Sequence, residues 1–408
     1  MARKPEILVG VDIGTAKCTV VVGESSPSGS LRIVGVGGAP SEGLQKGVVV
    51  NMEATVQSTA QAIKEAEISA GCEIHSVFVG VDGGHIRAFN SHGVVGVKGG
   101  EITRTDVDRV LEAARAVALP PDRDILHIVP QQFICDGQDG VKDPVGMAGV
   151  RLEAHVHLIT TAIASAHNVI KCCQRTGLHV VDLVLTPLAA SAAVLTPEEK
   201  ELGVALIDVG AGTTGVLVFQ HGSVRHTAVL SIAGNHVSGD VAAGLRTPFR
   251  EAERLKRRFG CALAALAPAD EILDVPSVGG RTPQQFSRRL LGEIIEPRLE
   301  EIFTLVHGQL DRAGAATGLT SGIVLTGGSV LLPGAAALAE RVLRMPVRLG
   351  IPLDCDGLDE TLPGPACAAA VGLLRYGVLP SEHVATVDDA DLLNKVRRRM
   401  VGWLKAFM

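Results

Sequence analysis

Two segments of the sequence, about half a chain apart, place an aspartate and a glycine-threonine turn at the end of an apolar run. Asp12 ends the first run, 7–11, and Asp208 ends the second, 204–207. Another apolar run follows each turn, so each segment predicts a β-hairpin with a tight polar tip. Glycine lets the backbone approach an anion closely, consecutive turn amides form a concave anion site, and threonine hydroxyls add donors. The two tips are therefore suited to phosphate.

The aspartates cannot themselves hold phosphate, because an ionised carboxylate only accepts hydrogen bonds. They suit a hydrated Mg²⁺ that bridges phosphate oxygens. Taken alone, one such string is more often an ordinary hairpin turn. Two copies in two halves of the chain favour two related domains that hold one nucleotide from both sides.

Length and composition indicate a large protein with two or three domains. The 408 residues are 46% hydrophobic, which is ample for sizeable cores. The eight cysteines include no C-x-x-C pair, so neither a zinc site nor a disulfide framework is indicated, and a reducing cytoplasm is expected. No run approaches the ~20 apolar residues of a membrane span. The formal charge of −6 argues against general nucleic-acid binding.

A third signal lies near residue 327, where the apolar strand 323–325 runs into Gly327 and Gly328 ahead of a helix over 333–343. Glycines at the start of a helix allow close approach of a nucleotide to free amides, although a plain strand-helix turn is equally compatible with this piece alone. Between the two hairpins, the pattern from Gly83 to about Leu158 changes to short strands around one helix, which predicts an inserted subdomain. Further on, the pattern predicts a loop over 276–281 and one long helix over 282–310.

These signals, in the order hairpin, hairpin, strand-glycine-glycine, resemble the superfamily of actin, heat-shock chaperones and sugar kinases. Within it the chain resembles the FtsA family of bacterial cell-division actin homologues over almost its whole length. The motifs that match are Asp12-Ile13-Gly14-Thr15 with Lys17, Glu201-Leu202-Gly203-Val204, Pro276-Ser277-Val278-Gly279-Gly280-Arg281, Ile323-Val324-Leu325-Thr326-Gly327-Gly328 and Ala370-Val371-Gly372-Leu373-Leu374-Arg375-Tyr376-Gly377.

The resemblance implies an α/β actin-like ATPase fold, with two ribonuclease-H-like lobes around a nucleotide cleft. The expected parts are a first lobe (1–83 and 162–200), an inserted FtsA-type subdomain (84–161), a second lobe (201–235 and 315–378) with its own subdomain (236–314), a flexible linker (379–391) and a C-terminal amphipathic helix (392–408).

The same resemblance implies the residues that bind ATP and Mg²⁺. Asp12 and Asp208 would face the magnesium, through water, and Lys17 would put a positive charge near the phosphates. The phosphate donors would come from Gly14, Thr15, Gly210, Gly212 and Thr213. Glu253 and Lys256, three residues apart on one helix face, would contact the adenosine with Gly327 and Gly328 opposite, although alone such a pair is more often an exposed salt bridge.

Three departures from the superfamily pattern bear on chemistry. Ala211 replaces a common glycine, and Gly215 stands where an aspartate is frequent. Thr186 stands where chaperone-like relatives carry a glutamate that orients the attacking water, and a threonine hydroxyl is no useful base near neutral pH. We therefore expect at most a weak ATPase, with turnover below ~1 s⁻¹, and nucleotide acting mainly on the angle between the lobes.

The C-terminal segment has the pattern of a helix that lies in a membrane surface. At 100° per residue, seven large apolar side chains share one arc, and cations flank or oppose it. The apolar set is Leu392, Leu393, Val396, Met400, Trp403, Leu404 and Phe407, and the cations are Lys395, Arg397, Arg398, Arg399 and Lys405. A helix docked on the body explains neither the cations nor the linker, and a basic localisation signal is a weaker reading.

The FtsA resemblance also implies partners and a location. Arg281, Arg288 and Arg289 near Phe286 would receive the acidic and apolar C-terminal peptide of the tubulin homologue FtsZ, although each arginine alone is as compatible with a solvated helix. The chain would polymerise with itself, so that many tails bind the anionic cytoplasmic face of the inner membrane together. Other division proteins would bind the inserted subdomain.

Two other classes remain as alternatives. A small-molecule kinase of the same superfamily would need a catalytic carboxylate and a sugar pocket, and would have no use for the tail. A heat-shock chaperone would need a further β-domain, whereas only about 30 residues follow Gly377.

Overall fold

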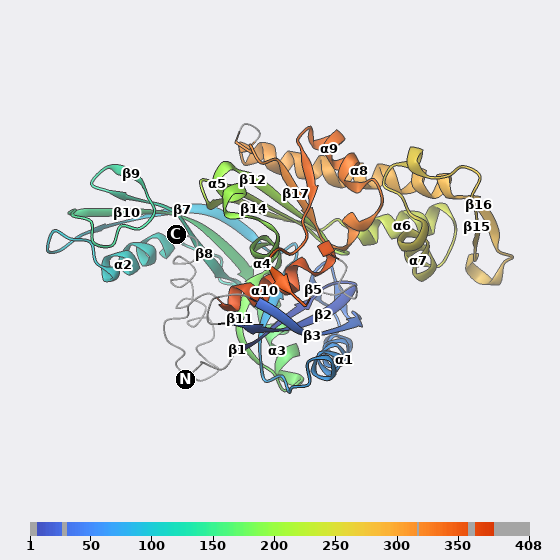
Figure 1. The fold of residues 1–408 in the computed structure, drawn as a ribbon, viewed down its shortest axis with the longest axis horizontal. Coiled ribbons are helices and arrows are strands. Elements are labelled where there is room, and N and C mark those ends of the chain that lie inside the picture. Colours follow the sequence, from blue (N-terminus) through green and yellow to red (C-terminus); the bar gives the residue numbers. More distant parts are fainter. Residues whose placement is uncertain (1–5, 27–30, 316–317, 358–363, 379–408) are drawn as a thin grey trace.

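The computed structural model describes residues 6–26, 31–315, 318–357 and 364–378, and it consists of two α/β lobes with one smaller subdomain at each end of the long axis (Figure 1). Each lobe has one mixed sheet. The first has the strand order β11-β6-β1-β2-β3-β19 and the second β14-β13-β12-β17-β18. Their strands are β1 (Glu6–Ile13), β2 (Lys17–Ser25), β3 (Leu31–Pro40), β6 (Ser76–Val81), β11 (His179–Leu185), β19 (Cys355–Asp356), β12 (Val204–Val209), β13 (Thr214–Gln220), β14 (Ser223–Leu230), β17 (Ile323–Thr326) and β18 (Val347–Leu349).

The two sheets repeat one plan. In each, an antiparallel three-stranded meander (β1-β2-β3 or β12-β13-β14) is extended by parallel strands from its first strand, β6 and β11 in one lobe and β17 and β18 in the other. The apolar runs of β1 and β12 are buried almost throughout, as strands covered on both faces must be. The duplicated hairpins predicted from the sequence are therefore the first hairpins of two related sheets.

Helices cover both faces of the first sheet. Helix α1 (Met52–Ala70), capped by Asn51 and ended by Gly71 in the left-handed conformation, lies with α3 (Ile163–Arg175) on the outer face. Helices α4 (Thr186–Val194) and α10 (Ala368–Val378) pack against each other between the two sheets (Figure 1). A Cβ on Gly372 would lie 1.8 Å from the carbonyl oxygen of Ala189, so only glycine permits this backbone contact.

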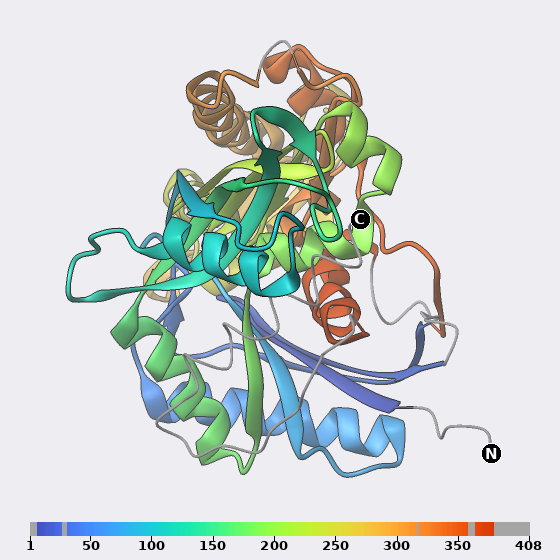
Figure 2. The same ribbon diagram turned by 90° about the vertical axis from the view of Figure 1, so that its left-hand side faces the viewer.

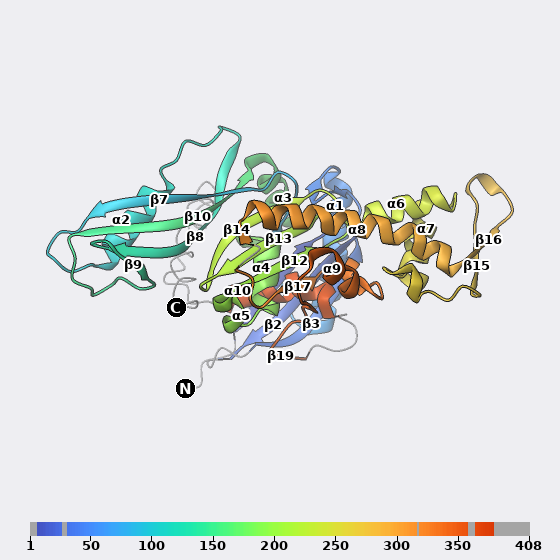
Figure 3. The same cartoon turned by 90° about the horizontal axis from the view of Figure 1, so that it is seen from above.

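Helices α8 (Arg288–Arg312) and α9 (Ala335–Leu343) cover the second sheet, and Figure 3 shows α8 running along the molecule towards the far subdomain. That subdomain contains α6 (Gly234–Gly244), α7 (Phe249–Phe259) and the hairpin of β15 (Ile272–Val275) and β16 (Gln284–Ser287). The short elements are α5 (Pro197–Leu202), β4 (Leu44–Gln45), β5 (Val48–Val49), and the 3₁₀ turns η1 (Ala264–Leu266), η2 (Val278–Gly280), η4 (Gly328–Leu331) and η5 (Gly364–Cys367).

The predicted helix over 282–310 is wrong at its start. Residues 284–287 form strand β16, and the helix begins only at Arg288. The cause is local, because the side chain of Ser287 accepts a hydrogen bond from the amide of Leu290 and so caps the helix there. The preceding residues pair with β15 instead.

The inserted subdomain extends from the other end of the molecule (Figures 1 and 2). It contains β7 (Arg87–Gly96), α2 (Arg104–Arg115), β8 (Arg123–Cys135), β9 (Gln138–Val141) and β10 (Arg151–Ala162), and its sheet has the order β7-β10-β8-β9. Helix α2 packs on one face around Val110, Ala114 and Phe133, which are buried in a core of their own.

The inserted subdomain is joined to the first lobe by the chain, but its polar contacts reach the second lobe. The Gln131 side chain donates to the carbonyl of Val224 at 2.8 Å, and His157 Nε2 lies 2.9 Å from the Thr227 hydroxyl. His157 Nδ1 donates to Asn90 Oδ1 at 2.6 Å, so Nε2 accepts from Thr227. The subdomain is thus bound to β14 as well as to its own lobe.

Within the described ranges, no helix is both long and apolar enough to cross a bilayer. The predicted linker and the C-terminal amphipathic helix lie outside the described residues.

Candidate functional site

The two hairpin tips face each other across a cavity of about 100 Å³ between the lobes. The first tip contributes Asp12 to Thr15 and the second contributes Asp208 and residues 210–213. The tips approach closely, because a Cβ on Gly212 would lie 2.4 Å from the Thr15 hydroxyl. The cavity is completed by Gly47, Asp82, Thr186, Gly327, Gly328, Pro365, Ala366 and Ala369. The structure therefore brings the two distant motifs together at one site.

The two tips have the same turn geometry. In the first, the amide of Gly14 donates to the carbonyl of Lys17 at 3.1 Å, and in the second the amide of Gly210 donates to Thr213 at 3.0 Å. Within the described part of the chain, the amides of Thr15, Ala211 and Gly212 donate no hydrogen bond. Free amides in a turn that borders a cavity are what an anion requires.

The carbonyls of the second tip are bound elsewhere. The amides of Gly234 and Asn235, at the start of α6, donate to the carbonyls of Gly210 and Ala211 at 3.1 and 2.7 Å. Ser329 adds a hydroxyl donor to Gly210 at 2.7 Å. Because these partners occupy the carbonyls, the tip presents donors to the cavity and few acceptors.

Three carboxylates border the same cavity, and their pKa values are raised. Burial raises the pKa of Asp12 to about 7, with the charge of Asp82 adding to the rise and Lys17 opposing it. Burial, followed by the charges of Asp82 and Asp12, raises the pKa of Asp208 to about 8. Burial also raises the pKa of Asp82. A cation near the three groups would relieve their mutual repulsion.

The carboxylates of the site are suited to a hydrated Mg²⁺, because they can accept hydrogen bonds from its waters. Among the described residues, no three His, Cys, Asp or Glu side chains are placed to ligate one ion. Magnesium commonly keeps several waters and contacts one or two carboxylates together with phosphate oxygens. Asp12 and Asp208 would accept hydrogen bonds from such waters, while the free amides of the tips would face the phosphates.

Sequence reasoning missed Asp82, although the sequence carries a signal for it. Residues 77–81 are an apolar strand that ends in Asp82 and two glycines, which repeats the pattern that singled out Asp12. Asp82 directly follows β6, which is parallel to β1 with Val79 opposite Val11, so Asp82 leaves the sheet at the same edge as Asp12 and two residues beyond the position opposite it. Both border the cavity. Asp82 belongs to the site by geometry.

Lys17, Glu253 and Lys256 do not border the cavity. Lys17 is exposed and passes over Gly38, and it acts on Asp12 through its charge. Lys256 is 6% exposed, and its Nζ lies 2.7 Å from Glu253, 2.9 Å from the Ser238 hydroxyl and 3.0 Å from the carbonyl of Gly234. The Lys256–Glu253 ion pair thus holds α6 at Gly234 and Ser238, near the second tip, and is called the first clamp below.

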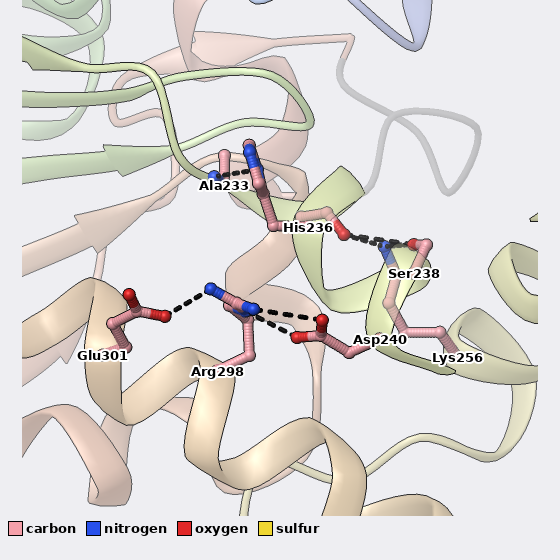
Figure 4. A network of polar contacts seen from close by, with 8 residues as sticks. Ala233, His236, Ser238, Asp240, Lys256, Arg298 and Glu301 are labelled. Atoms are coloured by element: carbon pink, nitrogen blue, oxygen red, sulfur yellow. Dashed lines mark hydrogen bonds and ion pairs between the residues drawn. The ribbon is translucent and has the colours of Figure 1, made fainter. Parts of the chain in front are cut away.

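Figure 4 shows the Lys256 network and a second clamp on the same helix. Arg298 of α8 donates to both carboxylate oxygens of Asp240, at 2.5 and 3.0 Å, and also binds Glu301. His236 accepts from the amide of Ala233. The first clamp fixes the start of α6, whose amides hold the carbonyls of the second tip, and the second clamp binds the same helix further along, at Asp240.

Two of the three positions that depart from the superfamily pattern, Thr186 and Gly215, lie at the junction of the lobes. Thr186 begins α4 and borders the cavity. Gly215 faces Pro187, and a Cβ there would lie 2.2 Å from Pro187 Cγ. The missing carboxylate at 215 therefore has a steric reason.

Gly327 has a positive φ of 92°, and a Cβ on it would lie 2.4 Å from Asp208 Oδ1. The glycine pair after β17 therefore packs against the second tip, and both of its residues border the cavity.

The predicted peptide site lies around the β15-β16 hairpin, away from the cavity. Arg281 and Arg289 are exposed. Arg288 is not free, because it pairs with Glu271 at 2.8 Å and donates to the carbonyl of Phe259. Phe286 is half-buried against the lobe's core, and Ile272 and Val278 are the exposed apolar side chains nearby along the chain.

Two family models match the chain. The model of "Cell division protein FtsA" matches residues 205–372, and that of the "SHS2 domain inserted in FTSA" matches residues 83–160. The chain is 51% identical to the cell division protein FtsA of Pseudomonas aeruginosa, over 91% of this chain and 89% of that protein. It is 41% identical to the Escherichia coli K12 protein of the same name, over 99% and 97%.

Solved structures show the same fold at low identity. A component of the "PilM-PilN type IV pilus biogenesis complex" superposes with a TM-score of 0.66 at 18% identity, and covers 91% of this chain and 99% of its own. The crystal structure of MreB5 of Spiroplasma citri bound to ADP gives 0.55 at 13% identity, over 90% and 94%. The two matched sheets, the inserted subdomain and these similarities together show an actin-like ATPase fold, and the chain belongs to the FtsA family of cell-division proteins.

Proposed function

We propose that the protein binds ATP with Mg²⁺ between its lobes and acts as a polymerising adaptor of the division ring. The observation that carries nucleotide binding is the pair of hairpin tips with unbonded amides, facing one another beside three carboxylates. Hydrolysis would be weak, because Thr186 supplies no base at the position where a carboxylate would orient water.

Nucleotide binding is tested by thermal unfolding of the full chain. Mg-ATP is expected to raise its stability by about 2.7 kcal/mol when ATP is ~100 times its Kd. Asp208→Asn removes a carboxylate that would face the hydrated cation, and should lower the affinity by about tenfold. Asp139→Asn, an exposed site on β9, is the matched control. A wild-type protein unaffected by Mg-ATP would refute the proposal.

The adaptor role joins two surfaces. The Arg281 and Arg289 face is proposed to bind the acidic C-terminal peptide of FtsZ, and the cationic amphipathic segment 392–408 is proposed to bind the cytoplasmic face of the inner membrane. Later division proteins would bind the inserted subdomain. About 1 kcal/mol per cation near anionic lipid makes each tail a modest anchor, and assembly of many chains would add avidity.

Membrane binding can be followed through Trp403, the only tryptophan in the chain. Its emission should shift to the blue when anionic liposomes are added, because the indole leaves water. A variant with Leu392, Val396, Met400 and Leu404 replaced by serine should show no shift. If the native protein shows no shift and stays in the supernatant on sedimentation with liposomes, the tether is refuted. A small-molecule kinase would not need this segment.

A further inference from the structure

Asp82 lies where it can contact both the opposite lobe and a ligand bound in the cavity. Strands β1, β6 and β11 are parallel neighbours, and the register places Val81 of β6 opposite Leu185 of β11. The residues that follow, Asp82 and Thr186, therefore leave the sheet side by side, at the same edge as Asp12. The carboxyl ends of parallel strands are where ligands bind in α/β sheets.

The two carboxylate oxygens of Asp82 have different environments. Oδ2 accepts a hydrogen bond of 2.5 Å from the hydroxyl of Thr213, which belongs to the second tip and hence to the other lobe. Oδ1 is buried and meets no donor of good hydrogen-bond geometry among the described residues, although the backbone amide of Gly83 also acts on this carboxylate, and Asp82 borders the cavity. A buried carboxylate oxygen without a donor is costly, so this atom indicates a ligand that donates.

The chemistry of the site restricts the donor. A phosphate cannot donate to Asp82 near neutral pH. A cation at the site would keep the neighbouring acids Asp12 and Asp208 ionised, and ionised carboxylates only accept hydrogen bonds. Water held by a cation is a strong donor, and Mg²⁺ commonly keeps several of its waters when it binds phosphates and one or two carboxylates. Thr213 is also a proposed phosphate donor, so bound phosphate and Asp82 compete for one hydroxyl.

We propose that Asp82 is a further positioning residue of the nucleotide site, whose free oxygen accepts a hydrogen bond from a water of the hydrated Mg²⁺ that accompanies the phosphates. This inference rests on the nucleotide binding proposed above. Asp82 then has two partners in turn. Oδ2 accepts from Thr213 of the opposite lobe until bound phosphates take that hydroxyl, and Oδ1 accepts from the cation's water when the nucleotide is bound.

The test compares ATP affinity, measured calorimetrically on the full chain, in buffer with Mg²⁺ and in buffer with EDTA. Asp82→Asn keeps the shape and a carbonyl oxygen but removes the charge. It should weaken binding in Mg²⁺ by about tenfold, the size of one charge-assisted hydrogen bond. In EDTA its affinity should equal or exceed that of the wild type, because a negative charge near the triphosphate is gone. Asp139→Asn should change neither value.

The two buffers distinguish the readings. An equal loss of ATP affinity in both buffers would mean that Asp82 is only a structural link to Thr213. No change of affinity in either buffer would mean that Asp82 does not contact the ligands of the site. Either outcome overturns this inference but leaves the proposed nucleotide binding intact. A wild type that binds no ATP would overturn the proposed function with it. If Asp82→Asn does not give the native circular dichroism spectrum, Asp82→Ser tests the same ratio.

Discussion

At the scale of single residues, close contacts between distant segments around the cleft explain which positions had to be small. Gly212 contacts Thr15, Gly327 contacts Asp208, and Gly215 contacts Pro187. In each case the partner belongs to another segment of the chain. These positions are glycine because the lobes and their connections pack too closely there for a side chain, in addition to the role of glycine in the turns.

Gly215→Ala is expected to destabilise the protein by about 1–3 kcal/mol, because its methyl group would lie 2.2 Å from Pro187 Cγ and must displace α4 or β13. Gly96→Ala is the matched control, since that strand glycine has no atom within 4 Å of an added Cβ. Its change should stay within about 0.5 kcal/mol. Urea denaturation measures both, and equal effects would show that the Pro187 contact does not limit position 215.

At the residue scale, the sequence predicted what is local and missed what depends on distant partners. The hairpin tips were predicted because strand pattern, glycine and threonine lie within a few residues. Asp82 has a local signal too, since it ends an apolar strand, but its contact with Thr213, 131 positions away, could not be predicted from the sequence. The burial of Lys256 was equally invisible, since it follows from packing of α7 against α6.

At the scale of elements, the hairpin β15-β16 and the start of α8 divide the predicted peptide-binding arginines into two kinds. Arg288 stabilises the subdomain through Glu271 and the Phe259 carbonyl, whereas Arg281 and Arg289 are exposed. Sequence alone could not separate them, because the four residues that form β16 were predicted as helix.

Arg281→Ala and Arg289→Ala are therefore expected to weaken binding of the FtsZ C-terminal peptide several-fold, with a loss that shrinks at high salt. Arg288→Ala should instead lower stability, by about 1 kcal/mol for a partly exposed ion pair. Fluorescence anisotropy with a labelled peptide and urea denaturation separate the two effects. Arg32→Ala, an exposed site on β3, is the control. Unchanged affinity in both single variants would exclude this face as the peptide site.

At the scale of the whole molecule, the duplicated sheets were predictable and the placement of the inserted subdomain was not. The sequence marks residues 84–161 as an insertion by their change of pattern. It does not reveal that Gln131 and His157 would bind β14 of the second lobe. That attachment is made by neutral polar groups over long sequence separations.

The attachment predicts a dependence of stability on pH. Burial lowers the pKa of His157 from 6.5 to about 3, so between these values the unfolded chain binds a proton that the folded chain excludes. Stability is thus complete above pH 6.5 and falls as the pH drops towards 3, by at most about 1.4 kcal/mol per unit for this group.

The variant His157→Gln keeps hydrogen-bonding capacity but does not titrate. Between pH 4 and 6.5 its free energy of unfolding, measured by urea denaturation, should fall less steeply with decreasing pH than that of the wild type, by the contribution of one proton. His127, whose pKa burial also lowers to about 3, remains in the variant and keeps part of the slope. Identical slopes in the two proteins would show that His157 is not the group that titrates.

The double attachment of the inserted subdomain has a thermodynamic consequence. The chain joins it to one lobe and hydrogen bonds join it to the other, so any change in the angle between the lobes changes its contacts. A protein that binds only this subdomain, but binds it more tightly at one lobe angle than at another, therefore favours that angle. Such a protein must also change the affinity of the cavity for nucleotide. By reciprocity, bound nucleotide changes the affinity of the subdomain for that protein by the same factor.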